Sequence, residues 1–196
     1  QSAHDGELES LGRIHDYRTF LRNYDQARKA GFSNINIDLM SALPGQSLES
    51  WMDTLEKTAA LGPEHISAYS LIIEEGTPFS DRYGYNGRES GTGKWPPLPD
   101  EELDRKMYEE TERFLRKKGY FRYEISNYAR PGYECRHNIG YWRRTDYLGM
   151  GIGAASLADP VRWKVDSDLA EYLSFFSDES CEDEKNPGGI RREVQS

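Results

Sequence analysis

The chain has 196 residues, of which 36% are hydrophobic and 30% are charged, with 4 Trp and 13 Tyr. This composition excludes a disordered chain and is typical of a folded protein with one substantial core. The formal net charge of -9 at pH 7 argues against nucleic acid as a partner, because phosphate recognition needs a clustered basic surface. No apolar stretch approaches the roughly 20 residues that cross a bilayer, so we expect a cytoplasmic protein.

The cysteine content is low. Cys135 and Cys181 are too few for a disulfide framework or for a metal cluster, and we interpret them as ordinary thiols of a reducing compartment. The first residue is Gln1 rather than Met, which suggests a piece of a longer protein.

The first half of the chain alternates between two hydrophobic periods. Helical spacing runs from Asp16 to Ala30, and period-two alternation follows over Ser33–Met40. A second helix begins after Ser47 and ends at Gly62, and a second strand covers His65–Ile72. This order with tight connections is typical of βα units around a parallel sheet or barrel.

The second half has less regular spacing. The elements expected there are, in order, a surface loop over Gly76–Pro99, a helix from Asp100 to Gly119, a strand over Tyr120–Tyr128, an aromatic and basic segment over Cys135–Arg144, a strand over Tyr147–Ser156 and a short helix over Asp166–Phe176. The acidic stretch from Asp178 to Lys185 and the break at Pro187 then predict a linker.

The first predicted strand is polar on one face. Asn34, Asn36 and Asp38 share that face, although a strand buried in a parallel sheet is usually apolar throughout. In a barrel this face points inward, and Asp38 lies near the carboxyl end, where βα barrels bind ligands. The alternative is an exposed sheet face without a ligand.

Six sequence blocks carry a family resemblance. They are Asn36–Gln46 (Asn-Ile-Asp-Leu-Met-x-x-Leu-Pro-Gly-Gln), His65–Leu71, Glu74–Thr77, Tyr123–Ala129, His137–Trp142 (His-Asn-x-x-Tyr-Trp) and Tyr147–Ala154. In this order they resemble the branch of the radical S-adenosylmethionine family that contains oxygen-independent coproporphyrinogen III oxidase and the haem chaperone HemW. The resemblance covers almost the whole chain.

The resemblance implies an α/β fold, the carboxyl-terminal part of a partial (β/α)6 TIM-like barrel with an added α+β extension. The expected divisions are residues 1–75 for the second half of the barrel, 76–99 for the surface loop, 100–176 for the extension and 177–196 for a linker or the start of a further domain.

The resemblance also implies S-adenosylmethionine and a [4Fe-4S] cluster as cofactors. Asp38 matches the carboxylate for the ribose hydroxyls, and Arg13 the cation for the amino-acid carboxylate. Gln1 matches the polar end of the preceding strand, and Met40 and Ile72 match positions that flank the adenine. The family's cluster ligands, Cys-x-x-x-Cys-x-x-Cys, are absent from this chain. We therefore expect no metal ligands here and no radical chemistry from this chain alone.

The His137 segment resembles HemW more than the oxidase. A histidine beside aromatic rings is suited to axial ligation of haem iron, with Asn138, Tyr141 and Trp142 lining the pocket. The alternative from the residues alone is a histidine that is packed and hydrogen-bonded without a ligand.

Two functions follow from the resemblance. The first is a chaperone that accepts haem and delivers it to apo-haemoproteins such as respiratory enzymes. The alternative is radical oxidative decarboxylation of coproporphyrinogen III to protoporphyrinogen IX. Other expected partners are a flavodoxin-like electron donor and a membrane surface contacted peripherally.

A glycine-rich segment allows one further interpretation. Gly149, Gly151 and Ala154 fit a relaxed dinucleotide-binding pattern, which requires a strand before it and a helix after it. Because Pro160 interrupts any such helix, we favour glycines that allow close backbone packing.

Overall fold

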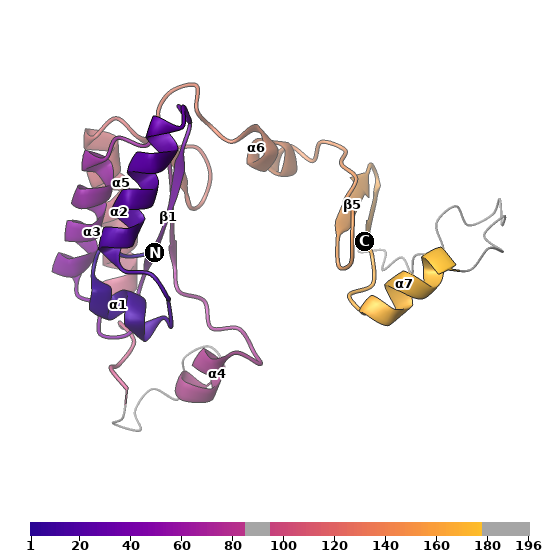
Figure 1. The fold of residues 1–196 in the computed structure, drawn as a ribbon, viewed down its shortest axis with the longest axis horizontal. Coiled ribbons are helices and arrows are strands. Elements are labelled where there is room, and N and C mark those ends of the chain that lie inside the picture. Colours follow the sequence, from indigo (N-terminus) through magenta and orange to yellow (C-terminus); the bar gives the residue numbers. More distant parts are fainter. Residues whose placement is uncertain (85–94, 178–196) are drawn as a thin grey trace. The chain divides into compact units, whose positions relative to one another are not determined.

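The computed structural model describes residues 1–84 and 95–177 (Figure 1). Its contacts divide the chain into two compact units, Gln1–Glu134 and Cys135–Ser196, and each is considered by itself. The domain boundaries expected at residues 75, 99 and 176 remain a prediction, because the division into two units does not test them. Among the described residues, no helix has both the length and the apolar character needed to cross a membrane.

The first unit contains a four-stranded mixed sheet with the strand order β1-β2-β4-β3. Its elements are α1 (Asp5–Ser10), α2 (Tyr17–Lys29), β1 (Asn36–Ser41), α3 (Leu48–Ala60), β2 (His65–Ser70), α4 (Pro78–Tyr83), α5 (Glu101–Lys117), β3 (Phe121–Arg122) and β4 (Asn127–Ala129). Strands β1 and β2 are parallel, whereas β4 is antiparallel to both β2 and β3.

The three long helices begin where the sequence places a capping side chain. The carboxylates of Asp16 and Asp100 and the hydroxyl of Ser47 each accept a hydrogen bond from the backbone N–H three residues later, at 2.7, 2.8 and 3.2 Å. Each bond satisfies one of the amides that have no partner within the helix. These three predicted helix starts are confirmed.

One face of the sheet forms the core, because α2, α3 and α5 lie against it (Figure 1). The buried residues of this core are Ile37, Leu39, Trp51, Leu55, Ile66, Ala68, Met107, Leu115, Tyr120 and Tyr128. Between α3 and α5, the Trp51 indole donates a 2.8 Å hydrogen bond to the Thr111 hydroxyl, which itself donates to the Met107 carbonyl. The indole N–H is thus satisfied although the ring is fully buried.

Three sequence expectations for the first unit are wrong in detail. Strand β1 begins at Asn36 rather than Ser33. The expected loop over residues 76–99 contains helix α4, which has Thr77 as its cap and proline at its first position. The expected strand Tyr120–Tyr128 is two short strands, because the chain turns between them, where the Glu124 side chain accepts from the Ser126 N–H at 2.9 Å.

The second unit contains α6 (Arg136–Trp142), the hairpin β5 (Ala155–Ala158) and β6 (Val161–Lys164), and α7 (Leu169–Ser177). The expected strand Tyr147–Ser156 is wrong over most of its length. Tyr147 forms an isolated bridge with Leu157, the segment that follows is irregular, and only Ala155 and Ser156 lie in a strand, β5. Positive φ angles at Gly151 and Gly153, 103° and 66°, end regular pairing there. The helix expected over 166–176 is present as α7, and the predicted linker lies outside the described residues.

Candidate functional site

The sheet face opposite the helices is polar. Side chains alternate along a strand, so Ile37 and Leu39 enter the core while Asn36 and Asp38 point away from it. The parallel register sets His65 beside Asn36 and Ser67 beside Asp38. The sequence assigned the two faces of β1 correctly, and in this chain Asp38 is exposed.

A chain of hydrogen bonds crosses this face and ends at Asp38. The Tyr123 hydroxyl lies 2.7 Å from His65 Nε2, and His65 Nδ1 lies 2.6 Å from the Asn36 side-chain oxygen. The Asn36 amide nitrogen donates to Asp38 Oδ1 at 2.7 Å, and the Ser67 hydroxyl donates to the Asn36 oxygen at 3.2 Å.

The direction of these bonds follows from their donors and acceptors. An ionised Asp38 can only accept, so Asn36 turns its NH₂ toward Asp38 and its oxygen toward His65. His65 must then donate from Nδ1 and, when neutral, accept the Tyr123 hydroxyl at Nε2. Burial lowers the pKa of His65, against smaller opposing effects of Asp38 and Glu124, and so favours this neutral form.

Gln1 lies beside β1, and the charges of Asp38 and Arg13 both act on Tyr69. The Gln1 carbonyl accepts a 2.9 Å hydrogen bond from the Met40 N–H beside β1. Burial raises the pKa of Tyr69, Asp38 raises it further, and Arg13 lowers it. Tyr69, which pairs with Met40 in the register, is therefore near enough to Asp38 and Arg13 for both charges to act on its hydroxyl.

The two positions expected beside adenine lie at the carboxyl ends of β1 and β2. Met40 is half-buried next to Tyr69, and Ile72, two residues beyond β2, is 76% exposed. Sequence reasoning did not single out Tyr69 or His65. Their signal was the same alternation that identified Asp38, read along the second strand.

The candidate haem residues share one side of α6. At 3.6 residues per turn, positions 137, 138, 141 and 142 span about 140° of the helix surface. The His137 and Tyr141 rings are 4.5 Å apart at 73°, and Tyr141 meets Tyr147 at 4.7 Å and 88°. His137 and Asn138 lie in the first turn, His137 is exposed, and Trp142 is 58% exposed.

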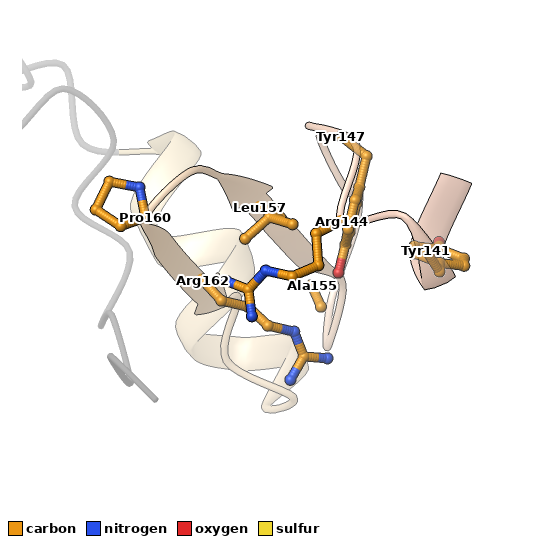
Figure 2. Close-up of a pocket in the computed structure, with 7 residues that line it drawn as sticks. All are labelled: Tyr141, Arg144, Tyr147, Ala155, Leu157, Pro160 and Arg162. Atoms are coloured by element: carbon orange, nitrogen blue, oxygen red, sulfur yellow. The ribbon is translucent and has the colours of Figure 1, made fainter. Parts of the chain in front are cut away.

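A cavity of about 680 Å³ lies beside these rings (Figure 2). It is lined by Tyr141, Arg144, Tyr147, Ala155, Leu157, Pro160 and Arg162. Of the four candidate haem residues, Tyr141 is the one that lines it. Neither arginine was a sequence candidate, because they are 18 positions apart and meet at one cavity through the β5–β6 hairpin and the bridge between Tyr147 and Leu157.

The glycine segment is not a dinucleotide-binding loop. It is followed by β5 rather than by a helix, so it presents no helix amino terminus to a phosphate. A Cβ on Gly149 would lie 2.1 Å from the Ala155 carbonyl oxygen, and the Gly149 N–H donates to the buried Ser156 hydroxyl at 2.9 Å. The preferred interpretation, close backbone packing, is confirmed at Gly149.

The described part of the chain contains no group of three or more His, Cys, Asp or Glu side chains that could hold a metal ion. Cys135 is the residue before α6, and Cys181 lies outside the described residues.

The chain is similar in sequence to proteins named haem chaperone HemW. It is 37% identical to that of Lactococcus lactis over 173 residues, which cover 88% of this chain and 44% of the relative. It is 40% identical to that of Escherichia coli over 154 residues, 79% of this chain and 38% of the relative. The mouse protein named radical S-adenosyl methionine domain-containing protein 1, mitochondrial, is 38% identical over 79% of this chain and 33% of its own length.

The fold is similar to that of coproporphyrinogen III oxidase (HemN) from Escherichia coli, described as a radical SAM enzyme. The TM-score is 0.69 at 23% sequence identity, and the match covers 91% of this chain and 42% of HemN. No family model matches. The chain spans less than half the length of the curated relatives named above. By sequence, the chain is a relative of proteins named haem chaperone HemW and of a radical S-adenosyl methionine domain-containing protein, and its partial α/β fold is similar to that of HemN.

Proposed function

We propose that this chain is part of a HemW-type haem chaperone, which binds S-adenosylmethionine at the polar sheet face and haem at α6. The observation that carries the proposal is the exposed His137 ring, held edge-on against Tyr141 on one side of a helix. An exposed imidazole keeps a nitrogen available for iron, and the neighbouring aromatic ring offers a wall for a flat macrocycle.

The polar sheet face has the groups that S-adenosylmethionine requires. Asp38 can accept hydrogen bonds from ribose hydroxyls, and its orientation is fixed through Asn36 and His65. Arg13 can pair with the cofactor's amino-acid carboxylate. Gln1, Met40 and Ile72 would complete the site around the sugar and the base. When reduced by an adjacent cluster, this cofactor supplies a 5′-deoxyadenosyl radical.

The residues of this chain do not fit a [4Fe-4S] cluster. Such clusters need about four cysteine thiolates or three plus the cofactor itself, and the chain has Cys135 and Cys181, 46 positions apart in sequence.

The proposed partners follow from this function. Haem is the cargo, and apo-haemoproteins such as respiratory enzymes are the recipients. A flavodoxin-like electron donor would serve the cluster of a longer protein, in the cytoplasm or at a membrane surface contacted peripherally.

The experiment is a haem titration of this chain, followed by the Soret band, with His137→Ala and His15→Ala compared. We expect His137→Ala to weaken binding by about tenfold or more and to change the band position, because one axial ligand is lost. His15→Ala should behave like the unchanged chain. Equal binding and equal spectra for all three proteins would overturn His137 as the ligand.

The fold match to HemN favours one alternative, radical oxidative decarboxylation of coproporphyrinogen III. The test joins this chain to a segment with the Cys-x-x-x-Cys-x-x-Cys motif, reconstitutes the cluster anaerobically and supplies coproporphyrinogen III. Formation of protoporphyrinogen IX would establish the alternative, and its absence together with His137-dependent haem binding would exclude it.

A further inference from the structure

The cavity of the second unit combines two arginines with aromatic and aliphatic walls (Figure 2). We propose that Arg144 and Arg162 form a carboxylate-binding pair in this cavity, and that its ligand is a flat, apolar molecule with carboxylate side chains, of the tetrapyrrole class. This inference rests on the proposed haem binding and adds to it the groups that recognise the propionates.

The backbone conformation of Arg144 supports a role for its side chain. Helix α6 ends in a Schellman motif, in which the Thr145 N–H donates to the Gly140 carbonyl at 2.9 Å and the Arg144 N–H to the Tyr141 carbonyl at 3.0 Å. The residue between these bonds must be left-handed, and Arg144 has φ 53°. Glycine is the usual residue at this position because a Cβ is strained there.

The backbone of Arg144 is therefore strained at the one position of the motif where glycine would be unstrained. Strained residues of this kind cluster at active sites and ligand-binding positions, where the side chain has a purpose that glycine cannot serve. The Arg144 side chain lines the cavity, so the purpose that the structure offers is a guanidinium at that wall.

The charged groups around the cavity also favour a carboxylate ligand. Arg144 and Asp159 are 3.7 Å apart, and both side chains are about 70% exposed. This distance is longer than a hydrogen bond, so the ion pair does not use the planar fork with which arginine binds a carboxylate. Arg162 enters the same cavity from β6 and adds a second positive charge.

The walls of the cavity favour a ligand with a flat, apolar body. Tyr141 and Tyr147 stand perpendicular to each other, and Leu157 and Pro160 add aliphatic surface. A small inorganic anion would gain nothing from these groups. A planar aromatic ligand would pack against them while its acidic side chains reached the arginines.

The same tyrosine connects this cavity to the candidate iron ligand. Tyr141 lines the cavity and contacts the His137 ring at 4.5 Å. A macrocycle that lies against Tyr141 can therefore meet the imidazole on one side and the guanidinium groups at its acidic edge.

The test uses metal-free protoporphyrin IX and its dimethyl ester, whose propionates carry no charge. Binding to the 196-residue chain is measured by quenching of tryptophan fluorescence. The variants are Arg144→Gly, which relaxes the helix end, Arg162→Gln, and Arg143→Gln as the control that removes a neighbouring charge from outside the cavity.

We expect Arg144→Gly and Arg162→Gln each to weaken binding of the free acid by about tenfold and to leave binding of the ester unchanged. Arg143→Gln should change neither. Because glycine suits the left-handed position, the melting temperature of Arg144→Gly should stay equal or rise, which separates lost recognition from lost folding.

Two results would overturn the inference. One is an equal effect of Arg143→Gln and Arg144→Gly on the free acid, and the other is an equal loss for acid and ester. Because the probe holds no iron, it tests the arginines apart from ligation. Porphyrin binding that depends on the arginines, together with haem binding and a Soret band that His137→Ala leaves unchanged, would uphold this inference while the ligation proposal fails. If haem ligation by His137 is normal but Arg144→Gly and Arg162→Gln do not change porphyrin binding, the ligation proposal stands and this inference fails.

Discussion

His65 acts on Asp38 through one intervening side chain. The imidazole fixes the orientation of the Asn36 amide, and the amide in turn orients a carboxylate oxygen of Asp38. The Tyr123 hydroxyl closes the far end of the chain at His65 Nε2. Each donor meets an acceptor only when the imidazole is neutral, so the arrangement depends on pH.

We predict that His65 makes folding pH-dependent. Its pKa is lowered in the native state, chiefly by burial, so below the ordinary value of about 6.5 the unfolded chain binds a proton that the native chain resists. The free energy of unfolding should therefore fall as the pH drops from 6.5 toward the native pKa and level off below it. Urea unfolding at pH 7.5 and pH 5.5 measures this fall.

The matched variant is His65→Gln, which keeps one donor and one acceptor but does not titrate. The stability difference between the unchanged chain and this variant should be larger at pH 7.5 than at pH 5.5. The same difference at both values would show that His65 does not carry the pH dependence.

Only part of this residue network could be predicted from sequence. The alternation of the first strand placed Asp38 and Asn36 on one polar face because that pattern is local. The partner Tyr123 is 58 positions from His65 and follows β3, so its contact depends on how β4 pairs with β2. No local pattern encodes that pairing.

At the scale of elements, the long helices were predictable and the short strands were not. Helix α5 has a capping aspartate, a repeating apolar face and basic residues in its last turn, all visible within 18 positions. Strands β3 and β4 have two and three residues, and tertiary pairing rather than propensity decides where they begin and end.

The buried hydrogen bond between α3 and α5 gives a prediction at this scale. Thr111→Val preserves the shape but leaves the Trp51 indole N–H without its acceptor, so we expect a loss of about 1–3 kcal/mol in the free energy of unfolding. Thr111→Ser retains the hydroxyl and should cost less.

A double-mutant cycle separates the bond from the packing. In a Trp51→Phe background, Thr111→Val should be less destabilising than in the unchanged chain, because no indole is left unpaired. Additive losses in urea unfolding would contradict a role for this hydrogen bond.

At the scale of the whole molecule, the chain contains candidate residues for two of the proposed cofactors but not for the cluster. The polar sheet face and α6 supply candidates for S-adenosylmethionine and haem, whereas the family's cysteine motif is absent from all 196 residues. We predict that this chain, reconstituted anaerobically with iron, sulfide and dithionite, forms no 5′-deoxyadenosine from S-adenosylmethionine. Chromatography of the reaction mixture measures this product. One 5′-deoxyadenosine per chain would contradict the conclusion that the chain alone does not hold the cluster.

Stability-guided redesign of this protein would select against Arg144. A design procedure that scores backbone geometry favours glycine at the end of α6, and a thermal-shift screen would rank that variant as an improvement. The variant would melt no earlier than the unchanged chain and would lack the guanidinium that lines the cavity. Libraries of this chain therefore need a ligand-binding readout beside the folding readout, since optimising the fold alone would remove an anion-recognition group without any visible defect.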